Sequence, residues 1–213
     1  MAVVTISSTF GSGGSVVAAG VAEKLGWDLK NRAIPAEVAS RLSLPIEAAL
    51  THDEAAESRL GRLLARFAVQ LGSDSAGNIP SEVLLGEESF KEQSESIIRR
   101  LAETSNCVIV GRAAAVVLGN VRTALHVRLD GSPARRAEHA AAALKLTVQE
   151  STQRLAETDR ARSLYVKHFY NRDWADPSLY QLMIDSTEFS LDTCVEIVLM
   201  ATRARFGSIA SPS

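Results

Sequence analysis

A run of small residues near the N-terminus has the composition of a phosphate-binding loop. It follows an apolar segment and consists of Gly11, Ser12, Gly13, Gly14 and Ser15. Glycines let backbone amides approach an anion closely, and a helix that begins at the loop adds the positive end of its dipole. The run therefore predicts a phosphate site, and a tight strand-to-helix turn without a ligand is the open alternative.

The loop matches the standard phosphate-loop pattern, GxxxxGK followed by Ser or Thr, only in part. In the best register the second glycine is Gly13, and the hydroxyl that would face magnesium is Ser15. Ser8 stands in place of the first glycine, and Gly14 in place of the lysine that contacts the outer phosphates. The dinucleotide fingerprint GxGxxG fits less well, because Val16 occupies its third glycine position.

Several arginines further along the chain could supply positive charge to such a site. Arg112 directly follows the apolar run 107–111, and the carboxyl ends of parallel strands are where open α/β sheets bind ligands. A guanidinium at that edge can bind a phosphate through two parallel hydrogen bonds. A later helical stretch contains Arg154, Asp159, Arg160 and Arg162.

Two other polar pairs have more than one interpretation. Arg135 and Arg136 begin a helical pattern, where they could reach a nucleotide base or its phosphates, or could form a solvated helix surface. Ser186 and Thr187 follow the last strand pattern. We expect their hydroxyls to cap the next helix, because Ser and Thr are preferred at that position.

The elements that must position these residues alternate between strand and helix. Short apolar, β-branched runs predict strands at residues 2–7, 107–111, 124–129 and 182–185. Helical spacing of apolar residues predicts helices at 16–25, 133–144, 148–170 and 190–205. This alternation implies a parallel sheet with helices on both faces.

The stretch between residues 34 and 103 has a different pattern. It has little strand signal, and helical patterns recur at 35–42, 55–71 and 81–102. We interpret it as a helical insert in the α/β unit.

Composition limits the classes of protein that this chain can represent. At 213 residues and 46% hydrophobic composition, it can bury the core of one α/β unit. The formal net charge of −2 argues against sequence-independent nucleic-acid binding. No segment approaches the roughly 18 apolar residues of a membrane helix, and the N-terminus lacks the pattern of a signal peptide. Two cysteines in apolar runs fit a reducing compartment. We expect a cytoplasmic protein without membrane or nucleic-acid partners.

Five segments resemble the cytidylate kinases, and more closely the cytidylate kinase-like family. Their order and spacing match over nearly the whole chain. They are FGSGGS (10–15), CVIVGR (107–112), RLAETDRAR (154–162), DWADPSLY (173–180) and IDST (184–187).

This resemblance implies the α/β class with a P-loop NTPase three-layer fold. In that fold a central parallel sheet of about five strands is flanked by helices. The whole chain, 1–213, would be a single P-loop kinase-like domain with its core at 1–33 and 104–213. A helical acceptor-binding insert would span about 34–103, and an arginine-bearing lid about 147–176.

The resemblance also implies ATP-dependent phosphoryl transfer to a nucleoside monophosphate, with CMP or dCMP as acceptor and with ATP and Mg²⁺ as cofactors. The glycine loop would hold the ATP phosphates, and Ser15 would face the magnesium ion. Arg112 and Arg32 would bind the acceptor. The lid residues that would close over the transferring group are Arg154, Arg160 and Arg162, with Asp159 orienting the lid.

Two departures from the cytidylate kinase pattern bear on activity. Gly14 replaces the lysine, although glycine is usual there in the kinase-like family, and Ala113 replaces the acidic residue after Arg112. Loss of one preorganised charge can lower a rate by about 10²–10³. A catalytically weak or inactive nucleotide-binding module, acting as a sensor or partner switch, is therefore the alternative function. Kinase activity on another small acceptor is a third. The partners are small-molecule nucleotides in each case, and the oligomeric state is left open, with a homodimer among the alternatives.

Overall fold

The computed structural model describes residues 1–30 and 81–207. Arg32 and the helices predicted at 35–42 and 55–71 lie outside the described residues. Within the described part, five strands form one parallel sheet in the order β2-β3-β1-β4-β5. The strands are β1 (Val3–Ser8), β2 (Asp28–Lys30), β3 (Cys107–Val110), β4 (Ala124–Asp130) and β5 (Leu182–Asp185).

The central strand β1 pairs in parallel with a strand on each side. Val3 pairs with Cys107 of β3 on one side and with Ala124 of β4 on the other. Its residues are β-branched or small and nearly all buried, as expected for a strand covered on both faces. The α/β class and the parallel sheet predicted from the sequence are confirmed, and the predicted strands agree with the observed ones to about one residue.

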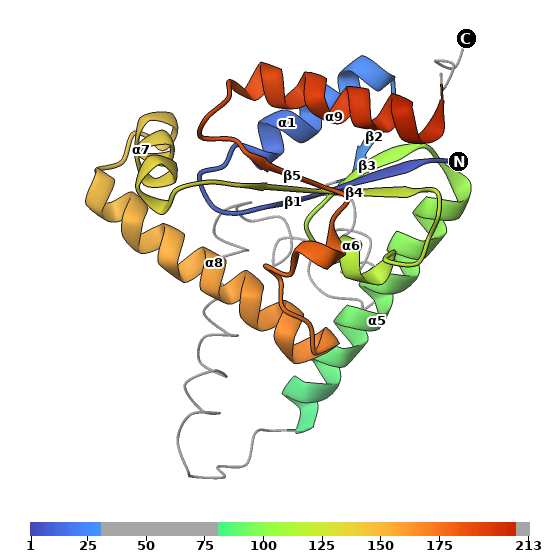
Figure 1. The fold of residues 1–213 in the computed structure, drawn as a ribbon. Coiled ribbons are helices and arrows are strands. Elements are labelled where there is room, and N and C mark those ends of the chain that lie inside the picture. Colours follow the sequence, from blue (N-terminus) through green and yellow to red (C-terminus); the bar gives the residue numbers. More distant parts are fainter. Residues whose placement is uncertain (31–80, 208–213) are drawn as a thin grey trace.

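Helices cover both faces of the sheet and so form three layers (Figure 1). Helices α1 (Gly14–Leu25) and α9 (Leu191–Phe206) pack on one face, where they share an apolar core with β1 and β4. On the other face, α5 (Ser81–Thr104) and α6 (Ala114–Val117) form a second apolar core with β1 and β3. Among the helices of the described residues, none combines the length and apolar character that crossing a membrane requires.

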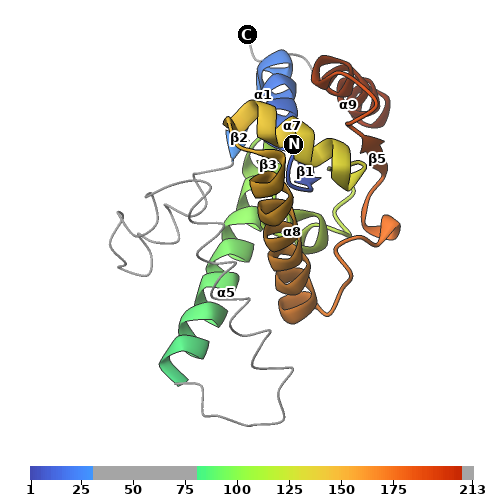
Figure 2. The same cartoon turned by 90° about the vertical axis from the view of Figure 1, so that its left-hand side faces the viewer.

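Two further helices lie at the carboxyl edge of the strands. Helix α7 (Pro133–Leu144) begins with a proline in its first turn, and α8 (Val148–Tyr170) begins with a capping box formed by Thr147 and Glu150. Figure 2 looks onto this edge, with α7 and α8 in front of the strands. The long helix α8 therefore crosses the carboxyl end of the sheet, where the glycine loop follows β1 and Arg112 follows β3.

The helix cap predicted at Ser186 and Thr187 is wrong. Helix α9 is capped by Ser190, whose Oγ accepts a hydrogen bond from the amide of Thr193. A turn separates the end of β5 from the helix, so Ser186 is too early in the chain to reach the free amides. Its hydroxyl donates instead to the carbonyls of Ser12, in the glycine loop, and Asp130, at the end of β4.

Candidate functional site

The loop between β1 and α1 depends on glycine at two positions. Gly11 and Gly13 have φ angles of 78° and 73°, in the left-handed region that residues with a Cβ rarely adopt. A Cβ at Gly11 would lie 2.2 Å from the carbonyl oxygen of Arg136, and one at Gly13 would overlap Leu191. The backbone therefore turns sharply enough to place the start of α1 directly after the end of β1.

Several backbone amides of this turn donate to no protein acceptor in the part of the chain that the structure describes. Within residues 1–30 and 81–207, no hydrogen bond to a protein acceptor is donated by the amides of Gly11, Gly13, Gly14 and Ser15. The last two amides belong to the first turn of α1, where the helix dipole is positive. Ser15 is exposed. Free amides at a helix N-terminus are a common way for proteins to bind anions.

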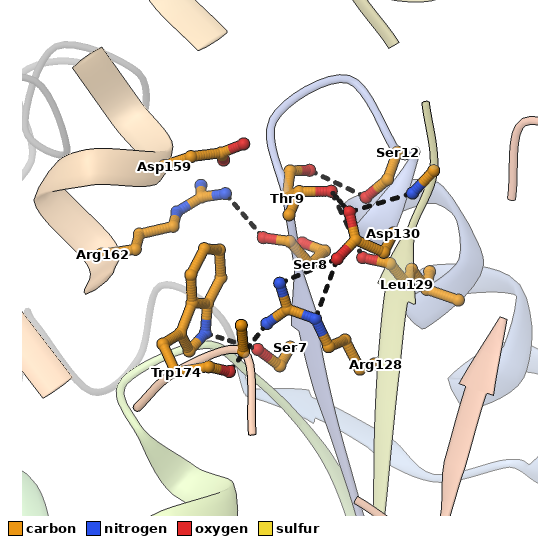
Figure 3. Close-up of polar contacts among 12 residues, drawn as sticks. Ser7, Ser8, Thr9, Ser12, Arg128, Leu129, Asp130, Asp159, Arg162 and Trp174 are labelled. Carbon is orange, nitrogen blue, oxygen red and sulfur yellow. Dashed lines mark hydrogen bonds and ion pairs between the residues drawn. The ribbon is translucent and has the colours of Figure 1, made fainter. Parts of the chain in front are cut away.

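The carboxylate of Asp130, at the end of β4, accepts hydrogen bonds from the start of the loop and from Gly131. Its Oδ1 accepts hydrogen bonds from Thr9 Oγ1 at 3.1 Å and from the amide of Gly131 at 2.9 Å (Figure 3). Ser186 adds a bond from its hydroxyl to the carbonyl of Ser12 at 2.8 Å. The strands on this side of β1 thus fix the loop through side-chain bonds to its backbone and to Thr9.

A buried arginine supports Asp130 in turn. Arg128 donates to Asp130 Oδ2 from Nε and Nη2 at 3.1 and 2.9 Å. Its guanidinium lies over the ring of Trp174, 4.3 Å from the ring centroid, and donates to the Trp174 carbonyl. The Trp174 indole donates to Ser7 Oγ at 2.8 Å (Figure 3).

Sequence reasoning gave no role to Arg128 or Asp130, although a signal was present. Arg128 stands in the apolar run of β4, and Asp130 comes two residues later, on the same face of the strand. A charge within a buried strand needs a partner. The spacing could therefore have predicted the pair.

The loop is also bonded to α7 and α8. The amide of Phe10 donates to Asp159 Oδ1 at 2.8 Å. Arg136 donates from Nη1 to the Phe10 carbonyl at 2.9 Å and to Asp159 Oδ2 at 2.7 Å. Arg136 is only 4% exposed, so its interpretation as a solvated surface residue is wrong. Arg135, whose side chain is 50% exposed and pairs with Glu188, fits that interpretation.

Two residues predicted on the lid helix bond to the loop or to the strand end before it. Asp159 bonds to Phe10, as described above, and Arg162 donates from Nη1 to the carbonyl of Ser8 at 2.7 Å (Figure 3). Both come from one face of α8, three residues apart. Arg154 and Arg160 lie on α8 as well, and their side chains are exposed.

Arg112 lies at the neighbouring strand end. The amide of Gly111 bonds to the Ile6 carbonyl at 3.0 Å, and φ is then 68°, 58° and 52° for Gly111, Arg112 and Ala113. Two consecutive left-handed residues with side chains are strained, and such strain is typical of functional sites. Burial raises the pKa of Tyr165 on α8, while its hydrogen bond to Tyr170 and the charge of Arg112 oppose this shift.

The metal that the resemblance implies needs few protein ligands. Among the described residues, no three His, Cys, Asp or Glu side chains lie close enough together to hold a metal ion. Magnesium bound to nucleotides usually keeps several waters and takes most of its other ligands from the phosphates. The exposed hydroxyl of Ser15, beside the amides at the start of α1, fits such a site.

Solved structures show the same fold. The crystal structure of an uncharacterized protein from Eubacterium ventriosum has a TM-score of 0.69 at 17% identity, with 96% of this chain and 99% of that chain covered. A gluconokinase from Sinorhizobium meliloti gives 0.51 at 16% identity, covering 97% and 93%. A shikimate kinase from Acinetobacter baumannii in complex with shikimate gives 0.50 at 12% identity, covering 97% and 95%.

Sequence comparison adds the family. A cytidylate kinase from Pyrococcus furiosus is 33% identical over 100 residues, which are 47% of this chain and 51% of the relative. The match therefore spans about half the length of this curated relative. The sequence model of the Cytidylate kinase-like family matches residues 3–188 and so covers most of the chain. This chain belongs to the Cytidylate kinase-like family.

Proposed function

We propose that this chain transfers a phosphoryl group from ATP to a nucleoside monophosphate, and that CMP or dCMP is the acceptor. One observation carries the proposal. The amides of Gly11, Gly13, Gly14 and Ser15 donate to no acceptor within the described residues, and they lie at the positive end of α1. Family membership and the kinase-like fold support the same activity.

In this proposal the protein acts by positioning and by charge. The glycine loop binds the ATP phosphates through its amides, and Ser15 faces the metal. When bound, ATP supplies the phosphoryl group and Mg²⁺ neutralises the outer phosphates. The lid, about 147–176, brings Arg154, Arg160 and Arg162 over the transferring group. Such positioning and charge stabilisation supply most of the catalysis in phosphoryl transfer.

The acceptor binds next to the strand end of β3. Arg112 holds the acceptor phosphate; this role is supported by its position directly after β3, whose carboxyl end lies beside that of β1. Arg32, which lies outside the described residues, contributes a second contact. The predicted insert, about 34–103, would bind the nucleoside; its residues up to 80 lie outside the described part of the chain.

A second candidate is a nucleotide-binding module without turnover. Gly14 and Ala113 remove two charged groups that cytidylate kinases use near the reacting phosphates. The amide cradle does not depend on either side chain. A protein with this loop can therefore bind nucleotide even where its rate is low.

One assay separates the two candidates. ADP release is followed with ATP, Mg²⁺ and each of CMP, dCMP, UMP, AMP and GMP, and ATP affinity is measured in parallel by calorimetry. Turnover with one acceptor, fastest with CMP or dCMP, supports the kinase. Measurable ATP affinity with no turnover supports the binding module.

Two variants test the assigned sites in the same assay. Arg112→Ala should raise the KM for the acceptor at least about tenfold, and Arg160→Ala should lower kcat more than affinity. Arg203→Ala, an exposed position on α9, is the matched control and should behave like wild type. Wild-type kinetics for both site variants would contradict the assignment.

A further inference from the structure

The loop departs from the standard pattern at two positions that touch each other. A Cβ at Gly14 would lie 2.2 Å from Ser8 Oγ and 2.4 Å from Ser8 Cβ, far inside van der Waals contact. The next atom, Ser8 Cα, would be 3.9 Å away, which is an ordinary contact. The Ser8 side chain therefore excludes any residue with a Cβ at position 14.

This contact makes the two departures a matched pair. A standard loop has glycine where Ser8 stands and lysine where Gly14 stands. Without the two side-chain atoms of Ser8, the nearest atom to the Cβ of a residue at position 14 would be Ser8 Cα at 3.9 Å, so that Cβ would fit. With them it does not. The serine–glycine pair and the glycine–lysine pair are thus alternative ways to fill the same space.

A cation from another element lies against the same residue. Arg162 of α8 donates from Nη1 to the Ser8 carbonyl at 2.7 Å (Figure 3). Asp159, three residues earlier, accepts the Phe10 amide at 2.8 Å. Two hydrogen bonds to adjacent parts of the loop therefore fix this face of α8, and the guanidinium with it. Its charge is present whichever of its N–H donors are engaged.

The geometry points to Arg162 as the residue that supplies the loop with the positive charge of the missing lysine, and to the Ser8–Gly14 contact as the feature that excludes that lysine. This inference rests on the proposed function, since it concerns the same phosphate site. A guanidinium on α8 contributes its charge only when α8 lies against the loop. Nucleotide affinity is therefore linked to the docking of α8, which a lysine within the loop would not require.

The test replaces the serine–glycine pair of this loop with the glycine–lysine pair of the standard loop. The variants are Arg162→Ala, Gly14→Lys, the double variant Ser8→Gly with Gly14→Lys, and the triple variant that adds Arg162→Ala. Affinity for ADP is measured by calorimetry with and without Mg²⁺, and kcat is measured with the best acceptor. Urea unfolding of each variant checks that it folds.

We expect Ser8→Gly to restore the ADP affinity that Gly14→Lys alone loses. Arg162→Ala in the wild-type background should weaken ADP binding at least about tenfold and lower kcat by about 10²–10³. Gly14→Lys alone should also weaken binding, whereas the double variant should bind ADP about as well as wild type. In the double variant, the loss of Arg162 should cost much less than in wild type, because the lysine provides the charge.

Two further variants make the result specific to the charge at this position. Arg162→Lys keeps the charge but loses the planar fork, so its ADP affinity should fall between those of wild type and Arg162→Ala. Lys167→Ala removes an exposed cation from the same helix and should change neither affinity nor kcat. It is the matched control for a general loss of positive charge from α8.

The outcomes separate the inference from the proposed function. An equal loss on removing Arg162 in both backgrounds, or wild-type affinity of Gly14→Lys alone, would overturn the inference while leaving a working kinase in place. The rescue pattern in ADP affinity without turnover on any acceptor would support the inference and contradict the kinase proposal. Failure of the wild-type protein to bind ADP would overturn both.

Discussion

Among the substitutions considered, replacement of the buried Arg136 should lower the free energy of unfolding most. Arg136→Met removes hydrogen bonds of 2.9 Å to the Gly131 carbonyl, 2.9 Å to the Phe10 carbonyl and 2.7 Å to Asp159. Methionine approximately fills the same volume, so the packing loss is small. The change therefore isolates the loss of the charged hydrogen bonds.

The expected loss of unfolding free energy depends on the Asp159 carboxylate, which loses its buried partner. Removing one partner of a buried ion pair costs about 3–5 kcal/mol, because the other charge loses its compensation. The Asp159 side chain is 19% exposed and keeps the Phe10 amide, so water and that bond recover part of the loss. We expect the free energy of unfolding to fall by about 3 kcal/mol, at the lower end of that range. Urea unfolding followed by circular dichroism measures it.

A double-mutant cycle and a neighbouring arginine test this reasoning. Asp159→Asn should cost about 1 kcal/mol, and the double variant should cost less than the sum of the single variants by about 1–2 kcal/mol. Arg135→Met, one residue away and exposed, should cost less than about 1 kcal/mol. Equal costs for Arg136→Met and Arg135→Met, or strict additivity of the cycle, would show that the buried bonds of Arg136 to Asp159 do not stabilise the fold.

Three further predictions address the loop, a core histidine and the lid helix. Gly11→Ala should cost about 2 kcal/mol more than Gly26→Ala in urea unfolding, since both have positive φ but only the first new Cβ meets a backbone atom, the Arg136 carbonyl. Burial lowers the pKa of His126, so the free energy of unfolding should fall as pH drops below the unfolded value of 6.5. His126→Asn should remove that part of the pH dependence between about pH 8 and about pH 5. Thr147→Ala should lower the free energy of unfolding by about 1 kcal/mol through loss of the α8 cap.

Each of these predictions has an outcome that contradicts it. Equal costs for the two glycine variants would show that the loop can move away from Arg136. An unchanged pH dependence in His126→Asn would assign it to other groups, and His139→Asn, at an exposed position, is the control. A Thr147→Ala variant as stable as wild type would mean that α8 begins without help from its cap.

The parts of the fold that the sequence predicted are those with a local signal. The β-branched run of β1, the glycines after it and the amphipathic spacing of α1 each carry their own periodicity or turn chemistry. Arg112 was expected at the sheet edge because it directly follows a strand. Such signals do not depend on which distant residues pack nearby.

The contacts that hold the loop had no local signal. Asp159 and Phe10 are 149 residues apart, and Arg136 and Phe10 are 126 apart. Nothing in either segment specifies the other, so the burial of Arg136 could not be derived from its place on a helix. Ser186 shows the related problem for short polar side chains, since a cap and a loop bond were equally compatible with its position.

Backbone amide chemical shifts during an ADP titration of isotope-labelled protein show whether the loop amides bind the nucleotide phosphates. We predict that the amides of Gly11, Gly13, Gly14 and Ser15 shift and saturate together with the affinity found by calorimetry, while the amide of Gly26 at the far end of α1 stays unchanged. Saturable ADP binding that leaves those four amides unmoved would contradict this prediction.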